Sequence, residues 1–378
     1  MRAGRTEEAG ALAKRIRAAI VRQDGAQLRH VDTKHCAKDT WAKVRQLTGA
    51  VPDDRASWCD DVSQAAQVMN DHYAAVSADA GYRYTQLKQT AAPSHCLTTA
   101  ESVFKALDHL HPTATGLGNI PAWFLRLGAP IFSCPIAQLY NQSISSGTVP
   151  RQWKSSYISP IPKVSRPSKP ADYRPISITP IMSRVMERLV VRTYIYPALQ
   201  HPPEGLYFSD QFAFRPTGST TAALITLLHT IGTMLSTNPF VRVFALDFSK
   251  AFDTVRHATL LDKMALLNIP DEGYNWIVDF YTSREHATKF RGEMSAFVQL
   301  MSSVIQGSSL GPASYIVTAA DLRPQHADNE IIKFADDTYL IIPAANSSIS
   351  EQELDHIQSW ATDNNLQLNS TKSKEIVF

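Results

Sequence analysis

The chain has 378 residues, 44% of them hydrophobic and 19% charged, a composition that excludes a disordered protein and fits a globular one. A formal net charge of +2 points to no particular partner, although acidic clusters could hide a local basic surface. No run of about 18 apolar residues occurs, so no membrane-spanning helix is expected. We expect reduced thiols in an intracellular protein, because no CxxC pair occurs among the four cysteines, Cys36, Cys59, Cys96 and Cys134.

The N-terminal part of the sequence predicts a helical extension. Residues 1–46 carry eleven Lys or Arg, and apolar residues recur at helical spacing over 9–21. A solvated basic helix and a nucleic-acid-contacting arm both remain open for this stretch. A second helix is predicted over 61–80, with Ser63 as an early cap, and a polar linker over 85–98.

The middle of the chain predicts helices around a proline-rich section. Helical periodicity indicates helices over 101–111 and 121–146, and again over 183–200 and 219–236. Between them, residues 150–182 contain seven prolines separated by short apolar pieces. Because the residue before a proline disfavours helix, this section predicts short extended segments and turns.

The last third of the chain mixes strands with helices. A nearly continuous apolar run over 240–248 predicts a buried strand, and residues 330–342 predict two short strands joined by a turn. Helices are predicted over 254–267 and 351–364, and the chain ends in a strand at 376–378. The mixture predicts an α+β fold.

Three aspartates stand out in this setting. Asp247 ends the buried strand, and Asp336 with Asp337 occupies the predicted hairpin turn, where a plain turn is the simplest interpretation. An aspartate leaving an apolar layer, however, needs a partner or a metal. Two carboxylates 4 Å apart repel by about 4 kcal/mol at an effective dielectric constant of 20. A magnesium ion would offset that repulsion, and two such ions would support attack by a 3′-hydroxyl.

Two residues shortly after Asp247 allow more than one interpretation. Phe252 could lie below the sugar of an incoming nucleotide and exclude a 2′-hydroxyl, or it could be ordinary core packing. Asp253 is predicted to cap the following helix, as aspartate commonly does, rather than to act in catalysis.

Seven segments, in order over more than half the chain, resemble the reverse transcriptase domain of non-LTR retrotransposons, particularly the jockey and chicken-repeat-like groups. They are WKSSYISPIPK (153–163), DYRPISITPIMSRVMERL (172–189), QFAFRPTGSTTAAL (211–224), FALDFSKAFDTVRH (244–257), VIQGSSLGPASYIV (304–317), FADDTYL (334–340) and LQLNSTKSKEIVF (366–378).

The resemblance implies the right-hand polymerase fold, with fingers and a palm whose antiparallel sheet carries the catalytic aspartates. The thumb is expected to be missing or truncated. Residues 1–98 would correspond to the connector between an endonuclease and the polymerase, 99–240 to the fingers, and 241–378 to the palm. The implied activity is RNA-directed DNA polymerisation, in which a primer 3′-hydroxyl attacks a deoxynucleoside triphosphate.

The resemblance also assigns residues and partners. Asp247, Asp336 and Asp337 match the catalytic and metal-binding aspartates, and the nucleotide-binding positions are Lys163, Arg174, Phe252, Gln306, Gly307 and Lys372. The implied cofactor is Mg²⁺, as two ions, with Mn²⁺ as a substitute. The implied partners are an RNA template, a DNA primer and deoxynucleoside triphosphates, in the nucleus, the cytoplasm or both. The oligomeric state stays open.

Departures from the family pattern keep other interpretations open. Leu117 and Gly118 stand where the family usually has proline and aspartate, in a loop expected to contact the template. An inactive nucleic-acid-binding remnant of a mobile element is therefore the alternative. A maturase or a telomerase-like enzyme is a third possibility that the FSKAFDTV and SSLGP segments fit less well.

Overall fold

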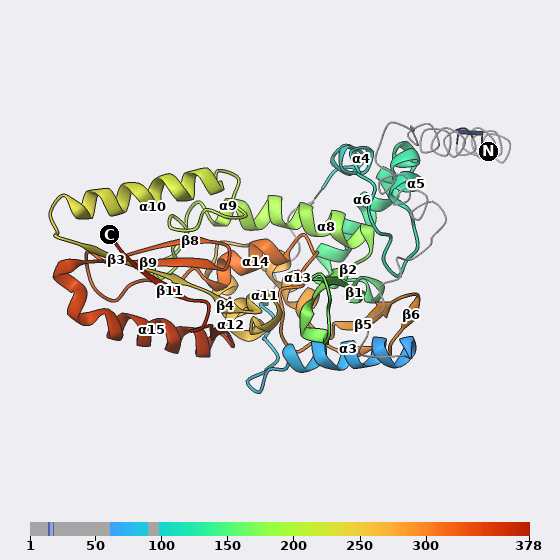
Figure 1. Cartoon of the computed structure of the whole chain (residues 1–378). Helices are drawn as coiled ribbons and strands as arrows, with labels where there is room; N and C mark the ends of the chain where they lie inside the picture. The colour runs from blue at the N-terminus through green and yellow to red at the C-terminus, as the bar shows by residue number, and fades with distance from the viewer. Residues whose placement is uncertain (1–13, 16–17, 19–60, 90–97) are drawn as a thin grey trace, which may run out of the picture.

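The computed structural model describes residues 14, 15, 18, 61–89 and 98–378. Most of the predicted basic helix, part of the predicted linker and three of the four cysteines lie outside these residues. The described chain forms two larger β-sheets and one two-stranded sheet, surrounded by helices (Figure 1). Among the described residues, no helix combines the length and the apolar character needed to cross a bilayer.

The first sheet, which we call the palm sheet, has four antiparallel strands in the order β11-β3-β9-β8. The strands are β3 (Val241–Leu246), β8 (Glu330–Phe334), β9 (Asp337–Pro343) and β11 (Lys374–Val377). Side chains alternate between the two faces of a strand. Val243 accordingly belongs to the apolar cluster under α10 (Thr220–Leu235), whereas Phe244 belongs to the main core shared with α15 (Ser350–Asp363). The two helices thus cover opposite faces of the sheet (Figure 1).

The second sheet, the fingers sheet, is built from distant parts of the sequence. Strand β1 (Ser155–Pro162) pairs antiparallel with β2 (Tyr173–Ile178) and parallel with β5 (Glu285–Phe290). Two short strands, β6 (Glu293–Met294) and β7 (Val298–Gln299), pair with β5. Helix α3 (Val62–Val76) lies against this sheet (Figure 1), and its apolar face forms a small core with residues of β1, β2 and β5.

The remaining elements connect the sheets and enclose the main core. They are α4 (Ala100–Asp108), α5 (Ala122–Leu127), α6 (Ala129–Ser145), α7 (Arg151–Lys154), η1 (Pro170–Asp172), α8 (Ile181–Val190), η2 (Val191–Ile195), α9 (Tyr196–Ala198), β4 (Phe248–Ser249), α11 (Ala251–Thr254), α12 (His257–Leu266), α13 (Asp271–Tyr281), α14 (Gly311–Thr318), η3 (Ala344–Ile349) and β10 (Gln367–Leu368). Helix α13 is largely enclosed, with Trp276, Ile277 and Phe280 fully buried.

The predicted α+β class and the hairpin predicted over 330–342 are confirmed, and two predictions about helix ends are wrong. The helix expected over 121–146 is two helices, because α5 ends at Gly128, where a Cβ atom would lie 2.1 Å from the Phe132 ring. The cap of α3 is Asp61 rather than Ser63. The Asp61 carboxylate accepts from the Ser63 backbone N–H at 2.9 Å, as an N-cap side chain does.

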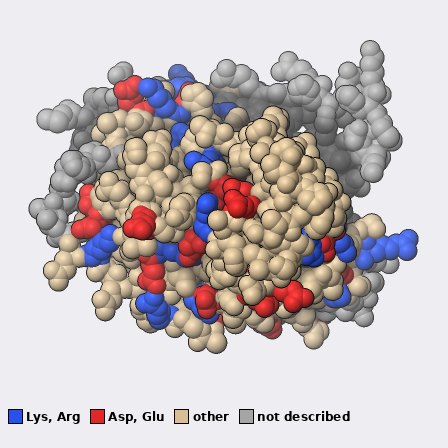
Figure 2. All heavy atoms as spheres, turned by 90° about the vertical axis from the view of Figure 1, so that its left-hand side faces the viewer, with Lys and Arg blue, Asp and Glu red and all other residues tan. Residues whose placement is uncertain are grey.

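The face at the palm end of the molecule carries charges of both signs. Figure 2 shows Lys and Arg side chains interspersed with Asp and Glu there, and neither sign forms a continuous patch. This mixture agrees with the small net charge of +2. This face therefore presents no extended field of a single sign.

Candidate active site

The palm sheet brings the three predicted aspartates to one end. Asp247 directly follows β3, Asp336 lies in the turn between β8 and β9, and Asp337 is the first residue of β9. In the β3–β9 register, Leu246 pairs with Thr338, so the chain positions of Asp247 and Asp337 are neighbours across the two strands. Residues 89 positions apart in the sequence thus form one acidic site.

The turn that carries Asp336 is held by a residue that sequence reasoning missed. Ala335 adopts a left-handed backbone, with φ of +58°, which lets the chain reverse tightly. The Gln211 side chain spans this residue: its Oε1 accepts from the Ala335 N–H at 2.9 Å and its Nε2 donates to the Ala335 carbonyl at 3.3 Å. Gln211 is the first residue of the segment QFAFRPTGSTTAAL. The position of this segment among the seven was the only sequence feature that could indicate a role for Gln211 at the site.

The acidic site has little opposing charge. Burial raises the pKa of Asp336, and the charges of Asp337 and Asp247 raise it further. Burial and the charge of Asp247 likewise raise the pKa of Asp337. Lys372 Nζ lies 3.6 Å from Asp247 Oδ2, and 68% of the lysine side chain is exposed. One solvated lysine thus faces three carboxyl groups.

The segment over 366–378 is hydrogen-bonded to the backbone of Asp247. The Asp247 N–H donates to Ser373 Oγ at 3.2 Å, and the Asp247 carbonyl accepts from the Asn369 N–H at 2.8 Å. These bonds place Lys372 beside the acidic site.

The residues present fit a divalent cation. Asp247 Oδ2 is enclosed and accepts no hydrogen bond, since Lys372 Nζ at 3.6 Å is beyond hydrogen-bond distance, so this oxygen is available to a metal cation. Within 61–89 and 98–378, no three His, Cys, Asp or Glu side chains form a ready-made metal cage. Magnesium rarely uses such a cage, because it binds through one or two carboxylates together with substrate phosphates. Hard carboxylate oxygens are the appropriate donors for it.

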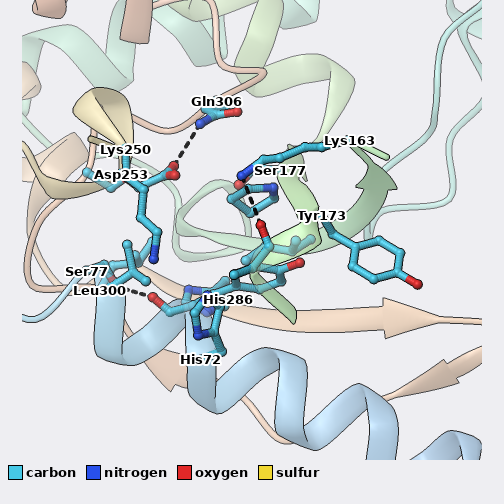
Figure 3. A pocket seen from close by; sticks show the side chains of 16 residues that line it. His72, Ser77, Lys163, Tyr173, Ser177, Lys250, Asp253, His286, Leu300 and Gln306 are labelled. Atoms are coloured by element: carbon cyan, nitrogen blue, oxygen red, sulfur yellow. Dashed lines mark hydrogen bonds between the residues drawn. The ribbon is translucent and has the colours of Figure 1, made fainter. Parts of the chain in front are cut away.

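A pocket lies between the fingers sheet, α3 and α11 (Figure 3). Its walls are His72, Tyr73, Val76, Ser77, Ile158, Lys163, Ala171, Tyr173, Pro175, Ser177, Lys250, Asp253, His286, Leu300, Ser303 and Gln306. Lys163 and Gln306 were predicted to bind nucleotide, and the structure brings them together here. Lys250 was not predicted, and its position three residues after Asp247 was the available signal.

The capping role predicted for Asp253 is wrong. Asp253 lies inside α11, whereas the following helix, α12, has Arg256 as its N-cap. The Asp253 carboxylate instead accepts a hydrogen bond from Gln306 Nε2 at 2.9 Å (Figure 3). Burial raises its pKa to about 6, although Gln306 and two lysines act in the opposite direction.

Three of the predicted nucleotide-binding residues are cations that influence one another. Burial lowers the pKa of Lys163, the charge of Asp253 raises it, and the charges of Arg174 and Lys372 lower it again. Arg174 is exposed on β2 and does not line the pocket. The structure therefore brings Lys163, Arg174 and Lys372 within electrostatic range of one another, with Lys163 alone among them in the pocket wall.

Phe252 stands between the core and the site. Its ring stacks on Tyr315 with centroids 4.6 Å apart and an interplanar angle of 11°, and the Phe214 ring meets its edge. Burial raises the pKa of Tyr315, and Asp336 and Asp337 raise it further, so this stack lies near the acidic site. Core packing and sugar selection are both compatible with this position.

Gly307 brings two backbone segments into close approach. Its φ is +105°, and a Cβ atom there would lie 2.4 Å from the Ser177 carbonyl oxygen. The neighbouring Gln306 carbonyl accepts from the Ser177 N–H at 2.9 Å. Only glycine allows this contact between the 306–307 loop and β2.

These features match a known family. The family described as reverse transcriptase (RNA-dependent DNA polymerase) matches residues 161–377, more than half of the chain. The chain therefore belongs to the reverse transcriptase family.

Its curated relatives come from mobile elements. The RNA-directed DNA polymerase from mobile element jockey of Drosophila melanogaster is 30% identical over 259 residues, which cover 64% of this chain and 27% of that protein. The probable RNA-directed DNA polymerase from transposon X-element of the same species is 26% identical over 370 residues, 90% of this chain and 40% of that protein. The chain thus spans well under half the length of these relatives. Among solved structures, a telomerase from Candida tropicalis, in complex with a fragment of telomeric RNA, matches 66% of this chain and 45% of its own at 13% identity and a TM-score of 0.45.

Proposed function

We propose that this chain is the catalytic core of a non-LTR retrotransposon reverse transcriptase, which extends a DNA primer along an RNA template. One observation carries the proposal. Asp247, Asp336 and Asp337 meet at one end of the palm sheet, and burial and mutual repulsion raise the pKa of the last two. A folded protein tolerates such a concentration of carboxyl groups when their function requires it.

Reverse transcriptases generally use divalent metal ions, and we propose Mg²⁺ here, with Mn²⁺ as a substitute. Asp247 and Asp336 would be the principal ligands, and Asp337 would contribute less directly. Two bound ions would activate the primer 3′-hydroxyl and stabilise the leaving pyrophosphate. The enclosed Oδ2 of Asp247, which accepts no hydrogen bond, supports this assignment.

The protein's own side chains would hold the nucleotide. Lys163 and Arg174 would bind the triphosphate, arginine through paired hydrogen bonds and lysine as a point charge. Lys372 would assist proton donation to the leaving pyrophosphate. Phe252, stacked on Tyr315, would form the wall beneath the sugar. Gln306 and Gly307 would complete the pocket.

We further propose that residues 1–98 form an N-terminal extension, 99–240 the fingers and 241–378 the palm. Strands β5, β6 and β7 (285–299) lie within the palm range of the sequence, but they would belong to the fingers because they pair in the fingers sheet. The close contact of the 306–307 loop with β2 supports a fixed junction between fingers and palm.

Primer extension tests the proposed function. The purified chain is given an RNA template, a DNA primer, deoxynucleotides and Mg²⁺, alongside Asp336→Asn and the matched control Asp355→Asn. Asp355 is exposed on α15, away from the palm-sheet end that carries Asp336. We expect extension by the parent and by Asp355→Asn, and none by Asp336→Asn. Extension by Asp336→Asn would refute the catalytic assignment.

The same experiment tests the alternative. If none of the three proteins extends the primer while all bind it in a salt-sensitive way, the chain is a non-catalytic nucleic-acid-binding remnant.

A further inference from the structure

The nucleotide pocket contains one acid among several basic groups. Asp253 is the single carboxylate among the side chains that line it, whereas Lys163, Lys250, His72 and His286 also face it. A pocket intended only for a triphosphate gains nothing from a buried negative charge, because that charge repels the ligand. The position of Asp253 therefore calls for a different explanation.

Contacts with β2 hold the backbone of Gln306 in place. Its carbonyl oxygen accepts from the Ser177 N–H on β2 at 2.9 Å. Next to it, Gly307 lies so close to Ser177 that no side chain fits. The Gln306 main chain thus has one position relative to the fingers sheet.

The side chain of Gln306 is fixed by Asp253. An ionised carboxylate only accepts hydrogen bonds, whereas a glutamine amide has a donor end and an acceptor end. The 2.9 Å bond from Nε2 to Asp253 Oδ1 therefore requires the amino group to face Asp253. The carbonyl oxygen of the amide points away from Asp253 (Figure 3), and among the described residues no donor bonds to it.

We infer that Asp253 is a positioning residue that sets the orientation of the Gln306 amide, so that the pocket receives an acceptor oxygen rather than an amino group. An acceptor there binds a donor on the ligand, such as a nucleotide sugar hydroxyl, and disfavours phosphate, which has only acceptors at neutral pH. The inference rests on the proposed function only in taking this pocket as the nucleotide site.

The charged surroundings make this device sensitive to pH. Lys163 from the end of β1 and Lys250 from the start of α11 favour the ionised form of Asp253, and burial opposes it. On α3, the charge of Asp253 adds to the burial that raises the pKa of Tyr73, and the lysines help to lower that of His72. His286 of β5 is neutral at physiological pH, because burial lowers its pKa to about 4. Protonated Asp253 can donate as well as accept, so the amide orientation is no longer imposed below about pH 6.

Nuclear magnetic resonance observes the orientation without requiring catalysis. The whole chain is labelled with ¹⁵N-glutamine, and the Gln306 side-chain signal is the one absent from Gln306→Met. We expect this signal to titrate with a midpoint near pH 6 in the parent and in the matched control Asp355→Asn, and to be flat in Asp253→Asn. A signal that is flat in the parent, or that titrates equally in Asp253→Asn, overturns the inference.

Kinetics then separates positioning from a merely structural role. In Asp253→Asn, we expect the KM for deoxynucleotide to rise about tenfold, equivalent to about 1.4 kcal/mol, with kcat within about twofold. In the parent, KM should rise as the pH falls below about 6, and in Asp253→Asn it should not. An equal fall in kcat with an unchanged pH profile of KM contradicts positioning. A parent chain that extends no primer contradicts the proposed function, and the resonance experiment still decides the role of Asp253.

Discussion

Two carboxylate sites in this molecule have opposite surroundings. Glu353 on α15 is fully buried, and four donors reach it: the N–H groups of Gln325 and His326, the His326 ring and the Asn329 amide. At the end of the palm sheet, Asp247 Oδ2 has no hydrogen-bond donor at all. We call the site around Glu353 the saturated site, because four donors bond to its carboxylate. We call the site of Asp247, Asp336 and Asp337 the starved site, because Asp247 Oδ2 accepts no hydrogen bond.

The difference has an electrostatic consequence. Burial on its own would raise the pKa of Glu353, but hydrogen bonds from Gln325, Asn329 and His326 lower it overall. For Asp336 and Asp337, burial raises the pKa and neighbouring carboxylates add to the effect. Ionisation therefore stabilises the fold at the first site and destabilises it at the second. The direction of each pKa shift therefore depends on the donors and charges around the carboxyl group and not on burial alone.

The largest expected effect comes from breaking the starved site. Asp247→Asn should reduce primer extension about 1000-fold or more, because the cation loses a ligand worth several kcal/mol. The same change should leave stability unchanged or raise it by about 0.5 kcal/mol at pH 7, since it removes repulsion at a partly exposed site. Extension assays and urea denaturation measure the two effects. A variant that loses both activity and stability would show that Asp247 is structural.

The saturated site should respond in the opposite way. Glu353→Gln should lower the free energy of unfolding by about 3 kcal/mol at pH 7, because buried donors lose a charged acceptor. The folded pKa of Glu353 lies below its ordinary 4.5, so its contribution is present above pH 4.5 and is lost as the pH falls through the folded value. Urea denaturation from pH 7 to pH 3 should show the variant and the parent converging. Glu351→Gln, exposed on the same helix, is the control. A constant difference across this range would contradict the account.

The sequence predicted the acidic site well, for a local reason. An apolar strand that ends in aspartate and an apolar hairpin that turns through two aspartates are strong signals within a few residues. The order of the seven segments supported the family resemblance, which assigned the three aspartates to one site. The palm sheet then needed only the β3–β9 pairing to bring Asp247 beside Asp337.

What the sequence did not predict depends on long-range contacts. No helix was predicted at α13, where polar residues and Gly273 interrupt the apolar pattern, although the helix is largely buried. Nor was β5 predicted: it buries His286 and Thr288 and pairs in parallel with β1, 130 positions earlier. The bond between Asp253 and Gln306 likewise joins segments 53 residues apart. A capping rule considers only neighbours in sequence, and it therefore gave Asp253 the wrong role.

The smallest effect concerns Lys372, whose charge moderates that of the starved site. Its side chain is 68% exposed and 3.6 Å from Asp247 Oδ2, so Lys372→Met should change stability by less than about 0.5 kcal/mol. It should slow extension about tenfold, as expected for one partly screened charge worth on the order of 1 kcal/mol. Lys372→Arg distinguishes two roles for it. Arginine keeps the charge but does not release a proton, so rescue of the rate indicates charge alone, whereas failure of rescue indicates proton donation to pyrophosphate. A rate unaffected by Lys372→Met would remove Lys372 from the site and leave the three carboxylates dependent on bound cations alone.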